Sequence, residues 1–212
     1  MIACPVCREG ALRPFLEVEA KLYHRCDACE ATVLDPAHRL DPAAERAHYG
    51  HHENDPADPR YRRFLARLAD PLIARLPAAA TILDYGCGPG PALARMLEEA
   101  GHRVSLYDPF FAADPAPLEA RYDAVTCTEV AEHFHDPAAE FDRLGGLLRP
   151  GGLLALMTCF QTEDARFAKW HYRRDPTHVV FYKEATLRRI AESRGWAIAI
   201  PVKDVALLQL PR

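Results

Sequence analysis

Residues 83–91, LDYGCGPGP, constrain the fold of this chain more than any other stretch. An apolar run at 81–85 leads into three alternating glycines, Gly86, Gly88 and Gly90, and a segment with helical spacing follows. Glycine adopts the left-handed backbone conformations of a sharp turn without steric cost. The pattern therefore predicts a buried strand that turns into a helix, the first unit of an α/β domain.

The chain beyond this turn continues to alternate between strand and helix patterns. We expect further strands at 103–108, 122–130, 152–158, 196–202 and 205–210, and helices at 91–100, 137–148 and 183–194. Such alternation predicts a doubly wound, Rossmann-like parallel sheet with helices on both faces. The very short connection between the final two strands predicts an antiparallel last strand.

The chain before residue 80 has a different organisation. We expect a zinc-ribbon-like module at 1–36, a linker with packing helices at 37–79, and the Rossmann-like domain at 80–212. Asp41, followed by proline, predicts the start of one linker helix. Residues 61–76 have helical spacing interrupted by a proline, which predicts one kinked helix or two short ones.

Four of the seven cysteines form two Cys-x-x-Cys pairs. The pairs are Cys4 with Cys7 and Cys26 with Cys29, at the spacing of a tetrahedral zinc site. A closed four-thiolate site stabilises a short segment and leaves no open position for chemistry. We therefore predict structural Zn²⁺, with unligated thiols or a redox pair as the alternative.

Composition and charge restrict the partners. The N-terminus has no basic stretch leading into an apolar run, and no segment approaches the roughly 20 apolar residues of a membrane helix. The net charge of −4 and the pI near 6.2 provide no overall basic field for nucleic acid. We expect a cytoplasmic protein that does not bind a membrane, and the charge disfavours nucleic acid as a partner.

The acids near the glycine turn distinguish between nucleotide ligands. Asp108 ends the second strand, where a carboxylate accepts hydrogen bonds from ribose hydroxyls. Asp84 lies just before the glycines, where it would repel a pyrophosphate but attract an ammonium or sulfonium. The turn therefore favours S-adenosylmethionine over a dinucleotide.

Four blocks in order, LDYGCGPGP, LYDP, YDAVTCTEVAEHFHDP and LLRPGGLLALMT, resemble the class I S-adenosylmethionine-dependent methyltransferases. The resemblance implies a seven-stranded sheet, with the methionine part of the cofactor near Asp84 and Gly86 and the ribose on Asp108. It also implies that Glu129 and Val130 line the cofactor pocket. The cysteine-containing leader resembles the zinc-binding leader of some sugar and natural-product methyltransferases.

This chain departs from the family pattern between Asp108 and Tyr122. The interval is too short for the usual helix, third strand and adenine-contacting acid. Asp114 is a weak candidate for the adenine contact.

Candidate groups for acceptor chemistry lie in two places. Glu132 and His133 follow the strand at 122–130, and either histidine, His133 or His178, is a candidate general base. The alternative is that Glu132 and His133 only organise the loop before Asp136, and a metal site in EHFHD is less favoured.

The second place is the long insert at 159–182, which is typical of a binding loop. Its pattern W-H-Y-x-x-D-x-T-H resembles the acceptor-side loop of related methyltransferases. We expect substrate contacts from Trp170, Tyr172, Arg173 and Arg174, with solvated arginines and a merely structural tryptophan as the alternative.

The sequence thus predicts S-adenosylmethionine-dependent methyl transfer to a small-molecule acceptor of sugar or natural-product type. One alternative is an RNA methyltransferase guided by the zinc module, although acids outnumber bases in that module. The other is a non-catalytic adapter that retains the fold. The sequence specifies neither the acceptor, nor the atom that is methylated, nor the oligomeric state.

Overall fold

The computed structural model describes residues 2–50 and 55–212. These residues form two compact units, each built from separate chain segments. Unit 1 contains the chain up to Gly50 together with Glu129–Phe141 and Thr158–Arg194. The described part of unit 2 contains residues 55–128 together with Asp142–Met157 and Gly195–Arg212. The domain boundaries expected after residues 36 and 79 stay predictions.

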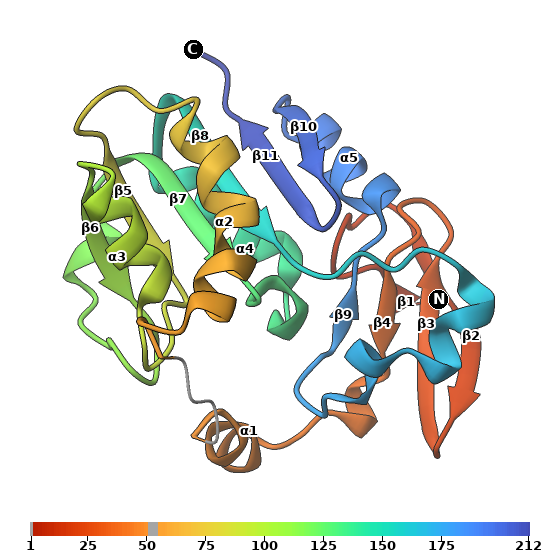
Figure 1. Ribbon diagram of the computed structural model, residues 1–212. Coiled ribbons are helices and arrows are strands. Elements are labelled where there is room, and N and C mark those ends of the chain that lie inside the picture. Colours follow the sequence, from red (N-terminus) through yellow and green to blue (C-terminus); the bar gives the residue numbers. More distant parts are fainter. Residues whose placement is uncertain (1, 51–54) are drawn as a thin grey trace. The chain divides into compact units, whose positions relative to one another are not determined.

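Unit 2 is built on a six-stranded sheet, shown in Figure 1. Its strands are β5 (Thr81–Tyr85), β6 (Arg103–Tyr107), β7 (Tyr122–Thr128), β8 (Leu148–Met157), β10 (Ala197–Val202) and β11 (Val205–Gln209). Their order is β10-β11-β8-β7-β5-β6, in which β8, β7, β5 and β6 pair in parallel. The last strand, β11, pairs antiparallel with both β8 and β10. The predicted Rossmann-like fold with an antiparallel last strand is confirmed.

The sheet departs from the seven strands that the family resemblance implies. In the described part of unit 2, residues 109–121 contain only the short helix η2 (Ala116–Glu119) and an isolated bridge between Asp108 and Ala112. A segment this short cannot form both a crossover helix and another strand. The sheet therefore ends at β6.

Helices α2 (Pro59–Ile73) and α3 (Ala92–Glu99) pack on this sheet through one apolar core. Leu65, Leu68 and Leu72 line the buried stripe of α2. Pro71 lies inside α2, so the segment forms one helix rather than two. Its position in the last turn removes one helical hydrogen bond near the end, and the buried stripe compensates for that loss. Helix α4 (Pro137–Gly146) begins in unit 1 and ends in unit 2.

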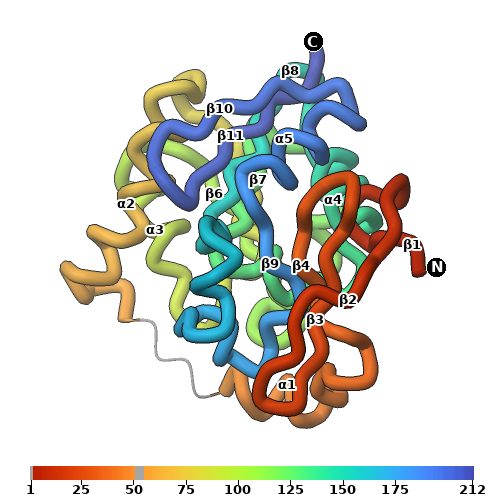
Figure 2. Tube along the Cα trace, turned by 90° about the vertical axis from the view of Figure 1, so that its right-hand side faces the viewer, coloured from red at the N-terminus to blue at the C-terminus, as the bar shows by residue number. Residues whose placement is uncertain are grey.

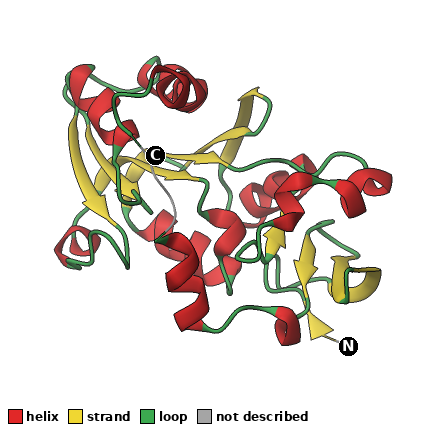
Figure 3. Cartoon of the chain, turned by 60° about the horizontal axis from the view of Figure 1, so that its bottom comes forward, coloured by secondary structure: helices red, strands yellow, loops and turns green. Residues whose placement is uncertain are grey.

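Unit 1 contains a second, antiparallel sheet of short strands. Its strands are β1 (Ile2–Ala3), β2 (Ala11–Val18), β3 (Lys21–Cys26), β4 (Thr32–Leu34) and β9 (Val180–Phe181), paired in that order. Figure 2 shows the hairpin β2–β3 in red, and Figure 3 shows these strands in yellow near the N-terminus. Glu19 and Ala20 form the turn between β2 and β3, and both have positive φ, as a two-residue hairpin turn requires.

The helices of unit 1 are short. They are η1 (Pro36–His38), α1 (Pro42–Tyr49), η3 (Ala131–His133), η4 (Asp164–Lys169), η5 (His171–Arg174) and α5 (Glu184–Ser193). The Asp41 carboxylate accepts the N–H groups of Ala43 and Ala44 at 2.9 Å, so α1 begins where the sequence predicts. Among the described residues, none of the helices has the length and apolarity needed to cross a bilayer.

Candidate active site

The glycine turn follows β5 in unit 2 and is bonded to the end of β6. Gly86 and Gly88 have φ angles of 78° and 65°, the left-handed conformation that favours glycine. The Gly86 N–H donates to the Tyr107 carbonyl at 2.7 Å, and the Gly88 N–H donates to the Asp108 carboxylate at 3.0 Å. Gly90 is buried just before α3. Two neighbouring parallel strands thus fix the turn between them.

Two buried carboxylates lie at this turn. Asp84 in β5 accepts a hydrogen bond from the Thr126 hydroxyl at 2.7 Å. Burial raises the pKa of Asp84 to about 6, against the Thr126 hydrogen bond, and the charge of Asp108 also raises it. Asp108 accepts the N–H groups of Phe110 and Phe111 at 2.8 and 3.1 Å. Two acids at one turn favour a cationic ligand over a pyrophosphate.

Glu129 and Val130 follow β7 directly in the chain and belong to unit 1. Both side chains are half-buried. Glu129 has a φ of 53°, a backbone conformation that costs energy for a residue with a β-carbon. Such strain occurs often at functional sites, but a cofactor contact of these residues stays a prediction.

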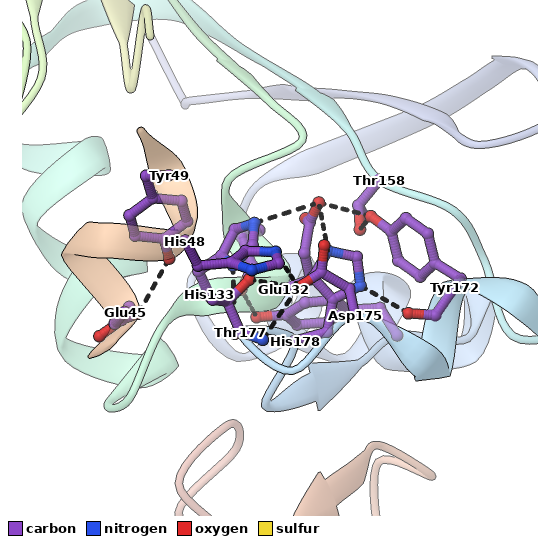
Figure 4. Close-up of polar contacts among 12 residues, drawn as sticks. Glu45, His48, Tyr49, Glu132, His133, Thr158, Tyr172, Asp175, Thr177 and His178 are labelled. Atoms are coloured by element: carbon purple, nitrogen blue, oxygen red, sulfur yellow. Dashed lines mark hydrogen bonds and ion pairs between the residues drawn. The ribbon is translucent and has the colours of Figure 1, made fainter. Parts of the chain in front are cut away.

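An acid–base cluster in unit 1 gathers side chains from distant parts of the chain, as Figure 4 shows. The Glu132 carboxylate in η3 is fully buried, and its Oε1 accepts the Tyr172 hydroxyl at 2.5 Å. Thr158 is hydrogen-bonded to the same hydroxyl at 3.1 Å. The second oxygen of Glu132, Oε2, is buried without a hydrogen-bond partner among the described residues. We refer to Glu132, His133, Tyr172, Asp175 and His178 as the acid–base cluster.

Both histidines of the cluster have a tautomer fixed by a backbone carbonyl. His178 Nδ1 donates to the Tyr172 carbonyl at 2.7 Å, and His133 Nδ1 donates to the Thr177 carbonyl at 3.1 Å. Each neutral ring therefore has its lone pair on Nε2. These Nε2 atoms lie 3.9 Å (His133) and 4.0 Å (His178) from Glu132 Oε1. Both Nε2 atoms therefore lie near the same carboxylate oxygen.

Burial governs the protonation of the cluster. It lowers the pKa of His178, although the Glu132 charge opposes this shift. Burial also raises the pKa of Glu132, against the opposing effects of His178 and Tyr172. For Asp175, burial acts to raise the pKa, but hydrogen bonds from the Thr177 hydroxyl and N–H lower it to about 2. A neutral His178 beside an ionised Asp175 is therefore favoured near neutral pH.

The spacing within the cluster suits a protic ligand better than a metal ion. Glu132, His133 and His178 each offer one potential ligand atom, and these atoms lie within 4.8 Å of one another. Nitrogen and oxygen ligands of tetrahedral zinc are only about 3.4 Å apart. An amine, which has more than one N–H donor, can instead bridge the 4.0 Å gap between Glu132 Oε1 and His178 Nε2 with two hydrogen bonds of about 2.8 Å, whereas a hydroxyl can donate to one of these two atoms. The cluster can thus accept a proton from a bound ligand.

Residues of α1 extend the cluster. His48 Nε2 lies 3.4 Å from Asp175 Oδ1, and the Tyr49 ring meets the His133 ring edge to face at 5.3 Å between centroids. The sequence groups these two residues with His51 and His52, which lie outside the described residues. Asp175 lies within the W-H-Y-x-x-D-x-T-H pattern, but no role was predicted for it.

The predicted substrate residues of the insert have different surroundings. Tyr172 belongs to the cluster, and Trp170 stacks on Tyr172 at 5.2 Å between ring centroids. Arg173 is buried and bonded to the cysteine-containing hairpin, whereas Arg174 is exposed. The geometry assigns Arg173 structural partners, so we leave it out of the proposed substrate site. His135, the second histidine of the EHFHD stretch, is also exposed.

The four paired cysteines converge in unit 1 as the sequence predicts. Cys4 and Cys29 have their sulfur atoms 3.8 Å apart, and those of Cys7 and Cys26 are 3.7 Å apart. Sulfur atoms around tetrahedral zinc, each about 2.3 Å from the metal, are separated by about 3.8 Å. A β-carbon on Gly10 would lie 2.5 Å from the Cys26 sulfur, so this glycine permits the close approach.

Both Cys-x-x-Cys turns end with a residue in the left-handed conformation. Arg8 and Glu30 follow the second cysteine of each pair, each with a φ of 60°. The Gly10 N–H donates to the Cys7 sulfur at 3.4 Å, and the Cys29 N–H donates to the Cys26 sulfur at 3.4 Å. Backbone donors to sulfur stabilise thiolate charge, so the site has the supporting contacts of a metal centre.

Comparison with known proteins identifies the family. Residues 49–199 match the family described as Methyltransferase domain. The biotin biosynthesis bifunctional protein of Bordetella avium is 34% identical over 157 residues, which cover 64% of this chain and 32% of that protein. The ubiquinone biosynthesis O-methyltransferase of Xylella fastidiosa is 33% identical over 121 residues, 44% of this chain and 48% of that enzyme. The chain thus spans between a third and a half of the length of these curated relatives.

A solved structure has the same fold. It is the 1,6-didemethyltoxoflavin-N1-methyltransferase of Burkholderia thailandensis with bound 1,6-didemethyltoxoflavin and S-adenosylhomocysteine. The match has a TM-score of 0.59 at 19% identity and covers 94% of this chain and 100% of that enzyme. At this identity the similarity shows the fold. The chain therefore belongs to the methyltransferase domain family, which confirms the predicted S-adenosylmethionine-dependent class at the level of family and fold.

Proposed function

We propose that this protein transfers the methyl group of S-adenosylmethionine to a protic group of a small-molecule acceptor. The observation that carries the proposal is the acidic glycine turn in a member of the methyltransferase domain family. Buried carboxylates at such a turn favour a cation and disfavour the phosphates of other nucleotide cofactors. The acid–base cluster supplies the chemistry that an acceptor needs.

The residues of the glycine turn fit the cofactor. When bound, S-adenosylmethionine supplies a methyl group on a positively charged sulfur, next to an amino acid and an adenosine. Asp84 would balance the positive charge, and the glycines at 86 and 88 allow the left-handed backbone of the turn and add no side chains to it. Asp108 would accept the ribose hydroxyls, and Gly90 would complete the turn, while a cofactor contact of Glu129 and Val130 stays a prediction from the family resemblance.

The acceptor class follows from the relatives and from the cluster. The named substrate of the Burkholderia enzyme is a small molecule, and the Xylella relative is an O-methyltransferase of ubiquinone biosynthesis. The gap between Glu132 Oε1 and His178 Nε2 suits one donor group. These observations favour a small acceptor with a hydroxyl or amine over RNA.

In this proposal His178 is the general base, and His133 and Glu132 support it. The Tyr172 carbonyl holds His178 Nδ1–H, so Nε2 can accept the proton that the acceptor loses. The buried Glu132 and the ionised Asp175 stabilise the imidazolium that forms. Trp170, Tyr172 and Arg174 are the candidates for acceptor contacts.

The four-cysteine site is proposed to hold structural Zn²⁺. Its sulfur separations and backbone donors match a closed tetrahedral site. All four cysteines are buried, so no position is left open for chemistry at this metal. The metal would order the short N-terminal strands of unit 1.

Calorimetry tests the cofactor assignment. The purified protein is titrated with S-adenosylmethionine, S-adenosylhomocysteine and NAD, beside an Asp84→Ala variant. We expect micromolar binding of both adenosyl ligands, no binding of NAD, and a loss of at least about tenfold in affinity for S-adenosylmethionine in the variant. A folded, zinc-loaded protein without adenosyl binding would contradict the proposal.

An acceptor screen then tests the reaction. Release of S-adenosylhomocysteine is measured with panels of phenols, hydroxylated sugars, heterocyclic amines and short RNAs. Turnover in a small-molecule panel supports the proposal, whereas turnover with RNA alone would replace it by the RNA methyltransferase.

A further inference from the structure

The sheet that contains the strands around the cysteines continues through β9, next to the backbone of the acid–base cluster. We call residues 2–34, with β1 to β4, the cysteine module. Its last strand, β4, pairs antiparallel with β9 through Thr32 with Phe181 and Val33 with Val180. The Leu34 N–H also donates to the Val179 carbonyl at 2.9 Å. Since His178 immediately precedes these residues, the module fixes the backbone that carries the proposed base.

Arg173 provides a second connection. Its guanidinium is buried and donates to Glu19 at 2.9 Å and to the Tyr23 hydroxyl at 3.3 Å, both in the β2–β3 hairpin region of the cysteine module. It also donates to the Ala168 carbonyl at 3.1 Å, which joins η4 to η5. The preceding residue, Tyr172, contributes its hydroxyl to Glu132 and its carbonyl to His178. The Arg173 contacts thus hold the backbone next to two contacts of the cluster.

Further contacts fix the start of the insert to the same module. The Thr32 hydroxyl donates to Gln161 at 2.7 Å, and both groups are buried. Arg25 donates to both oxygens of Asp164, at 2.9 and 3.2 Å. An arginine that binds a carboxylate through two nitrogens fixes its orientation as well as its distance. The insert is therefore held at its beginning, at Arg173 and at β9.

The order of the module itself depends on the four cysteines. A segment of about 33 residues is too small to stabilise a fold by its own apolar core, and such segments usually need a metal or disulfides. The four paired cysteines form no disulfide, and their sulfur atoms face one another at zinc-site distances. Metal binding at these thiolates would therefore provide the free energy that orders the hairpin.

We propose that the metal-bound cysteine module is the internal scaffold of the acid–base cluster, and that Arg173 and the β4–β9 pairing position Tyr172 and His178. Loss of the metal then disorders the cluster while the glycine turn keeps its structure. The inference rests on two parts of the proposed function, the Zn²⁺ at the four cysteines and the catalytic role of the cluster. It assigns the module a positioning function within this chain, in place of RNA guidance.

Hydrogen exchange tests the scaffold directly. The full chain is compared as purified with zinc and after removal of the metal by a chelator. We expect exchange at least about tenfold faster in peptides from 171–181 and 129–135, with peptides from 81–85 and 122–128 unchanged. Unchanged exchange at 171–181 would contradict the scaffold role of the cysteine module. Faster exchange throughout unit 2 would contradict the claim that metal loss disorders the cluster alone.

A matched pair of variants tests Arg173 with the metal still bound. Arg173→Met retains a long apolar side chain but removes every donor, whereas Arg174→Met changes the exposed neighbour. In Arg173→Met we expect the His178 imidazole, followed by NMR, to titrate closer to its ordinary pKa near 6.5, because release from burial favours its charged form. Glu132, His133, Tyr172 and Asp175 surround that ring in both proteins.

The control must retain the parental titration and zinc content. An Arg173→Met protein with full zinc and an unchanged His178 titration would overturn the positioning role. Binding of S-adenosylhomocysteine is measured on the same samples, and it stays within about twofold of the parent if the effect is confined to the cluster. Absence of that binding in the parent would refute the proposed function and leave the scaffold result intact.

Discussion

The glycine turn and the acid–base cluster are assembled in opposite ways. The turn and its two acids come from one strand–helix–strand stretch, residues 81–108, and the local pattern of glycines and acids specifies most of it. The cluster contains residues of η3, of η5 and of the segment between η5 and β9. Helix α1 adds His48 and Tyr49 as neighbours. Its members become neighbours only once the short strands of unit 1 have paired. Local sequence pattern is therefore sufficient to specify the glycine turn, whereas the acid–base cluster depends on long-range contacts.

The largest expected effect comes from removing the proposed base. A His178→Gln variant should lower kcat by about 10² to 10⁴, because general base catalysis contributes a factor of that size. S-adenosylhomocysteine affinity should stay within about twofold, since the glycine turn is an independent structure. Both are measured with an acceptor from the screen and by calorimetry. His135→Gln, which changes an exposed histidine of the same unit, is the control, and equal rates in the two variants would refute the assignment.

The next expected effect is a pH dependence of S-adenosylmethionine binding, which we assign to Asp84 at the glycine turn and not to the acid–base cluster. Burial, opposed by Thr126 and reinforced by Asp108, raises the pKa of Asp84 to about 6, so its carboxylate is charged above that pH and neutral below it. Affinity for S-adenosylmethionine should therefore fall as the pH drops through 6, by up to about tenfold per pH unit. Calorimetry between neutral pH and pH 4.5 measures the slope. Asp84→Asn should bind weakly with little of this dependence, and a parental slope in that variant would assign the titration to another group.

Most of the fold of unit 2 could be predicted because its signals are local. Strand periodicity and the glycine turn each depend on residues a few positions apart, and the predicted strands and helices match the observed ones within a few residues. The Asp41 cap of α1, in unit 1, is an equally local signal. The family resemblance implied a seventh strand, but the short interval before Tyr122 already indicated its absence. The sheet accordingly ends at β6.

The candidate site could be predicted only in part. The sequence contains the four cysteines at metal-site spacing, but it does not show that β4 pairs with β9 or that Arg173 is buried between η5 and the hairpin. Glu132 and His178 were predicted as separate candidates, 46 positions apart in the sequence. The fold brings His178 Nε2 to within 4.0 Å of Glu132 Oε1. Contacts between residues this far apart in the sequence depend on the topology of the chain, which no local sequence pattern specifies.

A smaller effect is expected at the hydrogen bond beneath Asp84. Thr126→Val keeps the shape of a buried side chain in β7 but removes the hydroxyl that donates to Asp84 at 2.7 Å. Loss of a hydrogen bond to a charged group costs about 1.5 kcal/mol, or about tenfold in affinity for S-adenosylmethionine at neutral pH. The pKa of Asp84 should rise further, so the pH at which binding weakens should also rise. A variant with weaker binding but an unchanged pH midpoint would separate the two effects and contradict this explanation.

The smallest effect is expected at Asp114, the sequence candidate for the adenine contact. Its carboxylate is exposed and accepts the Ala116 N–H at 3.0 Å, which caps the turn before η2. An exposed acid already engaged by its own backbone gains little from a ligand, so Asp114→Ala should change S-adenosylhomocysteine affinity by less than about twofold. Calorimetry beside Asp108→Ala provides the comparison, because Asp108 is buried at the glycine turn. A loss of tenfold or more at Asp114, about the worth of one hydrogen bond to a charged group, would mean that the shortened segment after β6 still recognises adenine through an acid.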